Sequence, residues 1–199
     1  MSAILSWISV NWIEIAAALV SIAYVILTIK EIIFLWFFGF LSAVLYAIVY
    51  LHSGIYAQMA LQGYYAFISI YGWYHWSVNS KKTSSGSVLP IVRLKRRLFI
   101  ILIVAWILLW LLISFVLYRF TDSLVPFWDA FTTSGSIIAT WMLTRKILEQ
   151  WLFWILIDFV AIGLCLWQNL YPTTALFVVY IIMATVGYRQ WRKTWQTTV

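Results

Sequence analysis

Charged side chains are scarce in this sequence: Asp, Glu, Lys and Arg make up 10% of its 199 residues, and Asp and Glu together number six. A soluble domain of this length needs more polar surface than these residues supply. Hydrophobic residues make up 65% of the chain. The composition therefore excludes an ordinary soluble protein and predicts one compact domain whose solvent is lipid.

Several patterns that mark other protein classes are also missing. The single cysteine, Cys165, allows no disulfide framework, and His52 and His75 do not form the Cys/His spacing of a metal site. No Gly-rich phosphate loop is present, so nothing predicts ATP hydrolysis. We therefore expect no catalytic residue, no metal, no cofactor and no enzymatic activity. No basic residue precedes the first apolar run, so we expect a retained first helix rather than a signal peptide.

Positive charge is present but confined to one side. The formal net charge is +7, and twelve of the thirteen Lys and Arg residues fall at one set of loop positions, with only Arg119 on the opposite side. This distribution follows the positive-inside rule and accounts for the charge without nucleic acid as a partner. We expect the N-terminus outside and the C-terminus in the cytoplasm.

Long apolar runs indicate the fold class. Seven segments have the roughly 20 residues that a spanning helix needs: 9–29, 32–52, 55–76, 98–119, 126–144, 150–169 and 172–190. The sequence thus predicts an all-α integral membrane protein with seven transmembrane helices.

The two halves of the sequence match when one is shifted by 115 residues. Rare residues coincide at this offset: Trp36 with Trp151, Tyr65 with Tyr180, Gly72 with Gly187 and Trp76 with Trp191. An odd number of helices between them makes the repeats parallel, an arrangement that transporters use. We therefore expect a 3+1+3 organisation: a first repeat at 9–76, a flexible cytoplasmic loop at 77–97, a linker transmembrane helix at 98–119 and a second repeat at 126–191.

The segment EQWLFWILIDF, residues 149–159, holds a carboxylate inside an apolar run. Trp151, Trp154 and Asp158 are spaced i, i+3 and i+7, so they share one helix face. Two indoles and a carboxylate suit a flat aromatic cation. The alternatives are an interfacial anchor for Trp151 and a hydrogen bond between helices for Asp158. Ala43 matches Asp158 in the first half, and a carboxylate needed only once favours a ligand.

Other polar residues inside the spans are further candidates. Gln58, Gln62 and Tyr65 follow i, i+4 and i+7 and could bind an amide or hydroxyls, or join helices. Glu14 and Asp129 match at the 115-residue offset, near helix starts. They are candidates for helix capping or for an outer vestibule that attracts cations.

Four segments, GIYAQMALQGYYAFISIYGWYHW, PFWDAF, LTRKILEQWLFW and GYRQW, resemble the Pnu-type (PnuC-like) vitamin transporter family. The resemblance covers the chain from Trp12 to Trp191. It implies a fold similar to SWEET proteins, facilitated diffusion of an unphosphorylated vitamin, trapping by a cytoplasmic kinase, a homotrimer and a place in the bacterial inner membrane. The family's WxxW pair falls on Trp151 and Trp154, and its third-helix glutamine on Gln62.

The substrate within the family is open. Asp158 and Ser42 stand where some nicotinamide riboside carriers of the family have asparagine. A carboxylate favours a cation, so we rank nicotinamide riboside first, thiamine second and neutral riboflavin third. Hypotheses from other functional classes are a seven-helix receptor or light sensor and a purely structural membrane subunit. The parallel repeat argues against the sensor, and the polar face at mid-membrane argues against the structural subunit.

Overall fold

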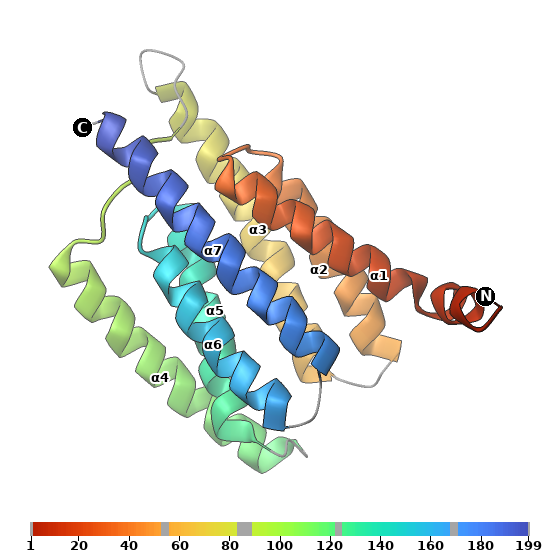
Figure 1. Cartoon of the computed structure of the whole chain (residues 1–199). Coiled ribbons are helices and arrows are strands. Elements are labelled where there is room, and N and C mark those ends of the chain that lie inside the picture. The colour runs from red at the N-terminus through yellow and green to blue at the C-terminus, as the bar shows by residue number, and fades with distance from the viewer. Residues whose placement is uncertain (1, 53–55, 83–88, 122–124, 168–170, 199) are drawn as a thin grey trace. The chain divides into compact units, whose positions relative to one another are not determined.

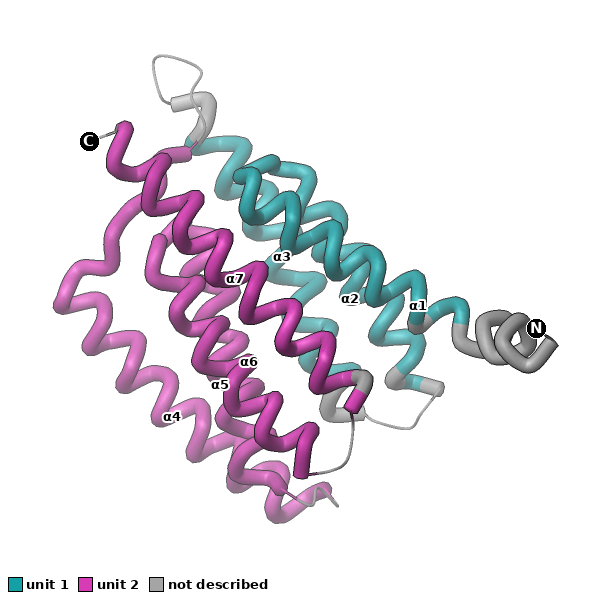
Figure 2. The backbone as a smooth tube through the Cα atoms, viewed as in Figure 1, with its two compact units in different colours: residues 1–88 teal, residues 89–199 magenta. Residues whose placement is uncertain are grey.

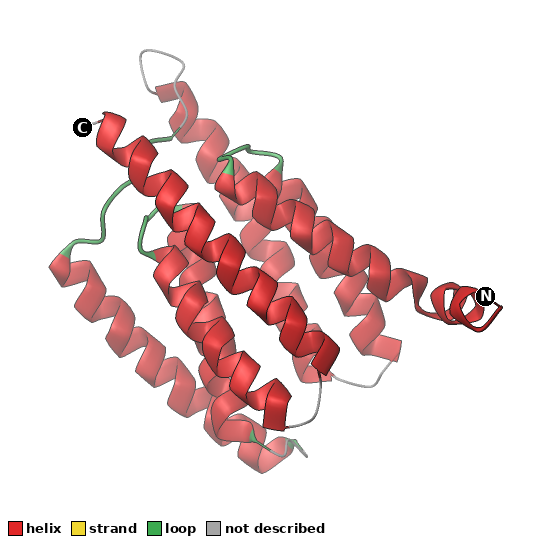
Figure 3. Ribbon diagram, in the orientation of Figure 1, coloured by secondary structure: helices red, strands yellow, loops and turns green. Residues whose placement is uncertain are grey.

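Helices make up nearly all of the computed structural model, which describes residues 2–52, 56–82, 89–121, 125–167 and 171–198 (Figures 1 and 3). The described residues form seven helices, with no strand beyond one isolated β-bridge. They are α1 (Ser2–Ile29), α2 (Leu35–His52), α3 (Tyr56–Lys82), α4 (Arg96–Phe120), α5 (Pro126–Thr144), α6 (Gln150–Trp167) and α7 (Tyr171–Thr198). The predicted seven-helix fold class is confirmed. By length and hydropathy, α4 and α6 are each able to cross a membrane.

The chain divides into two compact units, residues 1–88 and residues 89–199 (Figure 2). In the first unit α2 packs against both α1 and α3. In the second unit α6 packs against both α5 and α7, and α4 adds to this set by packing on α5. The middle helix of each three-helix set is therefore its centre, and the fourth helix belongs to the second unit.

The first helix of each set ends in the same turn. Glu31 and Lys146, 115 residues apart, have φ values of 58° and 50°. The next amide donates to the carbonyl five residues earlier in both turns: Ile32 to Leu27 (3.0 Å) and Ile147 to Met142 (3.1 Å). This left-handed C-cap with a six-residue hydrogen-bonded loop is a Schellman motif. The predicted repeat thus extends to backbone conformation.

A cluster of two tryptophans and a glycine also occurs in both units. In the second, Trp151 lies edge-on to Trp191, with ring centroids 5.5 Å apart and an interplanar angle of 87°. A Cβ atom on Gly187 would lie 2.6 Å from Trp151 Cζ2, so only glycine fits beneath the ring. The same arrangement recurs 115 residues earlier in the sequence, at Trp36, Gly72 and Trp76. The cluster is a packing device of the repeat itself.

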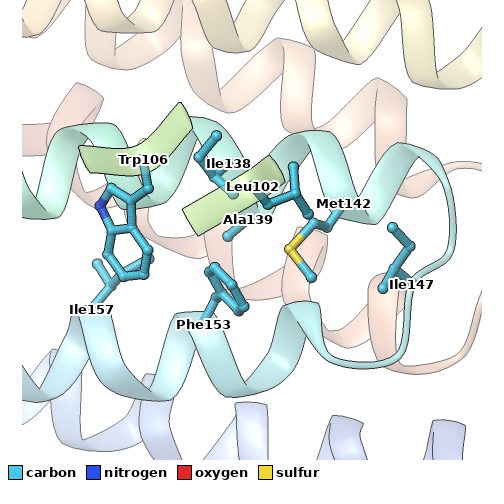
Figure 4. Packing of buried hydrophobic residues seen from close by; sticks show 8 residues of the cluster. All are labelled: Leu102, Trp106, Ile138, Ala139, Met142, Ile147, Phe153 and Ile157. Carbon is cyan, nitrogen blue, oxygen red and sulfur yellow. The ribbon is translucent and has the colours of Figure 1, made fainter. Parts of the chain in front are cut away.

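The fourth helix is more than a connector. Trp106 of α4 stacks against Phe131 and Phe153, at centroid distances of 5.0 and 5.3 Å, and covers Gly135 (Figure 4 shows Trp106 beside Phe153). Its indole N–H donates to the Phe131 carbonyl at 3.3 Å. The opposite side of α4 is exposed and apolar, as expected for contact with lipid: Ile100, Ile101, Val104, Ile107, Leu108 and Leu111.

The segment predicted as a flexible loop, residues 77–97, has defined structure at both ends, while residues 83–88 lie outside the described residues. Helix α3 continues to Lys82, beyond the expected end of the repeat at residue 76, and α4 begins at Arg96. Residues just before α4 are hydrogen-bonded to the turn between α5 and α6, with Val92 N donating to Lys146 O at 3.0 Å. Polar composition suggested flexibility because it does not reveal backbone partners.

Candidate functional site

Asp158 is the carboxylate whose burial the sequence made conspicuous. It lies on the inner face of α6 with 5% of its surface exposed. Among the described residues it has neither a hydrogen bond nor an ion pair. The alternative role, a hydrogen bond between helices, therefore lacks a partner in this part of the chain. A buried, unpaired carboxylate is costly, which favours a ligand as its counterpart.

Trp154 lies one helical turn before Asp158, so the two side chains are about 6 Å apart at Cβ. Its ring is only partly buried and packs on the core cluster that includes Ala139. The matching residue in the first unit is Gly39, where an added Cβ would lie 3.0 Å from Cε2 of Tyr24. Ala139 matches Tyr24 at the 115-residue offset. The large ring at this contact is therefore Trp154 of α6 in the second unit and Tyr24 of α1 in the first unit. This exchange leaves an indole beside Asp158.

Trp151 differs from Trp154 in being enclosed. Only 3% of its surface is exposed, and its ring packs against Trp191 and Gly187 as described above. This environment favours a packing role over interfacial anchoring or ligand stacking. Stacking by Trp151 stays a prediction, and its buried indole N–H has no hydrogen-bond partner in the described parts of the chain.

The third-helix candidates lie in the first unit. Gln62 is buried, with 9% exposed, and forms no hydrogen bond with another described residue. Tyr65 is partly buried and its carbonyl accepts a 2.7 Å hydrogen bond from Ser69 Oγ. The side chain of Gln58 lies outside the described residues. Gln62 thus resembles Asp158 in being a buried polar group with unused hydrogen-bonding capacity.

The remaining candidates, Glu14 and Asp129, are near helix starts, and hydroxyl side chains occur along α5. Asp129 lies in the first turn of α5, where the helix dipole stabilises a negative charge, while the side chain of Glu14 lies outside the described residues. Hydroxyls of α5 donate to carbonyls of their own helix, as Ser136 does to Thr132 at 2.8 Å and Thr140 does to Ser136 at 2.7 Å. Their donors are used locally, so they favour close packing rather than a polar path.

Gln150 was missed by the sequence reasoning. It is fully buried, and neither its amide nitrogen nor its amide oxygen has a hydrogen-bond partner among the described residues. It precedes Trp154 by four residues and therefore shares its face of α6. The sequence contains a clue to this residue, because the 115-residue offset matches polar Gln150 with apolar Leu35. In the structure both residues are fully buried.

No group of three or more His, Cys, Asp or Glu side chains within the described residues could hold a metal ion. The groups that α6 presents are instead an indole face, a carboxylate and an amide. Together they can bind an aromatic cation with polar substituents by cation–π attraction, charge pairing and hydrogen bonds.

Comparison with known proteins shows which transporters the chain is similar to. The nicotinamide mononucleotide transporter family model matches residues 11–193. The nicotinamide riboside transporter PnuC of Escherichia coli is 24% identical over 91% of this chain and 85% of its own length. The riboflavin/roseoflavin transporter RibM of Streptomyces davaonensis is also 24% identical, over 90% of this chain and 84% of its own.

A solved structure shows the same fold. The crystal structure of the vitamin B3 transporter PnuC superimposes with a TM-score of 0.77 and 22% identity, covering 98% of this chain and 87% of that one. Because the family model spans nearly the whole sequence, the seven helices described above are those of a transporter in the bacterial inner membrane. The chain belongs to the nicotinamide mononucleotide transporter family.

Proposed function

We propose that this protein takes up a cationic, unphosphorylated vitamin, with nicotinamide riboside as the first candidate. The observation that carries the proposal is Asp158: a buried carboxylate without a partner among the described residues, next to Trp154 and present in one repeat only. Nicotinamide riboside has a positively charged pyridinium ring, which Trp154 can stack on and Asp158 can neutralise.

The other site residues have supporting roles in this proposal. Gln62, with Gln58 and Tyr65 on the same helix, binds the amide or ribose hydroxyls. Trp151 holds α6 against α7 and so fixes the helix that bears Trp154. Because no ligand can shift an equilibrium without differential affinity, these groups bind more tightly in one orientation of the two repeats than in the other.

Transport is by facilitated diffusion, and a cytoplasmic kinase retains the vitamin by phosphorylating it. The basic loops face the cytoplasm, which places the N-terminus outside and the C-terminus inside. The protein assembles as a homotrimer, as its family resemblance implies. Detergent-corrected mass measurement on the purified protein tests the trimer, and cysteine labelling from each side tests the orientation.

Thiamine is the second candidate because its thiazolium ring is also an aromatic cation. Riboflavin is third: RibM and the Escherichia coli PnuC are each 24% identical to this chain, but a neutral ring leaves Asp158 without a counter-charge. The test is uptake of each labelled vitamin into proteoliposomes without ATP or an ion gradient. We expect saturable uptake of nicotinamide riboside, and lack of uptake of all three vitamins would contradict the proposal.

A further inference from the structure

Residues 91–94, which we call the strap, precede α4 and lie along the turn between α5 and α6. Val92 N donates to Lys146 O at 3.0 Å, and Leu148 N donates to Val92 O at 2.9 Å. These bonds form an isolated parallel β-bridge between Val92 and Ile147. Ile147 is 2% exposed, so the bridge rests on the core of the second unit.

Both carboxylate oxygens of Glu149 accept hydrogen bonds from the strap. Arg93 Nε donates to Oε1 at 2.5 Å, and Leu94 N donates to Oε2 at 2.8 Å. The Glu149 side chain is 15% exposed and that of Arg93 is 51% exposed. Glu149 immediately precedes α6, where a carboxylate commonly caps the first-turn amides. Here both oxygens accept from the strap, so the residue joins two segments.

Arg93 extends the connection to α7. Its guanidinium carbon lies 5.2 Å from the ring centroid of Trp195, a cation–π contact. The hydrogen bond from Arg93 to Glu149 raises the pKa of this guanidinium, which favours its charged form. The start of α4, the start of α6 and the end of α7 are therefore joined at one place.

The repeat shows that the fold does not require a carboxylate here. Phe34 matches Glu149 in the first unit and packs edge-on against Trp73 of α3, with ring centroids 5.7 Å apart. In the first unit an aromatic contact therefore stabilises the start of α2, at the position where the second unit has the ion pair. The ion pair is found where a fourth helix has to be attached.

We propose that Glu149 is a positioning residue for transport. It fastens α4 and the end of α7 to the start of α6, so that the second unit moves as one four-helix body while α6 carries Trp154 and Asp158. This inference rests on the proposed function, because it concerns the movement that delivers the vitamin. Glu149 acts through the strap and does not touch the substrate.

Hydrogen exchange tests the attachment without any vitamin. In Glu149→Ala and Arg93→Gln, we expect peptides covering residues 91–94 and 146–149 to exchange roughly two- to tenfold faster than in the wild type. Arg96→Gln removes the same charge three residues further on, outside the strap, and is the matched control. The swapped pair Arg93→Glu with Glu149→Arg should restore protection of Val92 and Leu148, but not of Leu94, whose acceptor is lost.

Uptake and binding then test the positioning role. We expect Glu149→Ala to lower the uptake rate about tenfold or less while the Kd for nicotinamide riboside changes less than about twofold, because the contact is remote from the ligand. The swapped pair should recover part of the rate. Wild-type exchange and uptake in Glu149→Ala would overturn the proposal, as would a matching loss of affinity. If the wild type transports no vitamin, the proposed function and the positioning role fail together, whereas the exchange data still decide the attachment.

Discussion

A Cβ atom at Gly187 would lie 2.6 Å from Cζ2 of Trp151, closer than packed atoms approach each other. The contact is possible because α7 presents bare backbone to the indole. Its counterpart, between Gly72 and Trp36, has a corresponding distance of 2.5 Å. Two independent copies of one contact indicate that it stabilises the three-helix set.

We therefore expect Gly187→Ala and Gly72→Ala each to lower the free energy of unfolding by about 1–3 kcal/mol through overpacking. Thermal unfolding of the purified protein in detergent measures the effect. Gly163→Ala is the control, since an added Cβ there meets nothing within 4 Å. The control should be stabilised by roughly 0.5–1 kcal/mol, because alanine favours helix over glycine. Equal stability of Gly187→Ala and Gly163→Ala would refute the packing role.

Substitutions of Trp151 and Trp154 should have different effects, the first on stability and the second on ligand binding. Trp151→Ala removes a fully enclosed ring and should cost about 3–5 kcal/mol of stability, and Trp36→Ala should cost a similar amount. Trp154→Ala should instead weaken nicotinamide riboside binding by about three- to thirtyfold through loss of cation–π attraction. Thermal unfolding and calorimetric titration of the variants measure both quantities. A binding loss in Trp36→Ala as large as that in Trp154→Ala would count against this division.

The sequence predicted the parts of the fold that repeat. Matched tryptophans and glycines 115 residues apart predicted the repeat, and the structure places them in the same kind of cluster in both units. In the structure Gly72 and Gly187 each lie beneath a tryptophan ring, so the missing side chain has a clear steric reason. The seven helices were predictable because long apolar runs must satisfy their backbone internally in lipid.

Contacts made by the backbone or across long separations could not be predicted. The strap is bonded to a turn more than fifty residues away, as Val92 to Lys146 shows, and nothing in its Ser-, Lys- and Gly-containing surroundings reveals this partner. Nothing in the sequence pairs Glu149 with its partners, although its carboxylate accepts hydrogen bonds from Arg93 and Leu94. The placement of Asp158 on an inner face was predictable from helical spacing, whereas the lack of a partner required coordinates.

Gln150 carries a prediction of its own. Within the part of the chain that the structure describes, neither polar atom of its buried amide has a partner, a condition that costs about 1–3 kcal/mol. Gln150→Leu reproduces the residue at the matching position of the first unit and should stabilise the protein by a similar amount in thermal unfolding. Leu35→Gln is the reverse substitution and should destabilise it. A Gln150→Leu variant with unchanged stability and lost uptake would instead assign the amide to transport.

The central claim is that Asp158 pairs with a cationic vitamin. Its most direct test is calorimetric titration of nicotinamide riboside into the wild type and Asp158→Asn, with Asp129→Asn as an acidic control outside the α6 site. The account predicts binding by the wild type and by Asp129→Asn, and affinity about 10- to 150-fold weaker in Asp158→Asn, as expected for loss of a charged hydrogen-bond partner. Equal affinity in Asp158→Asn and the wild type would contradict it.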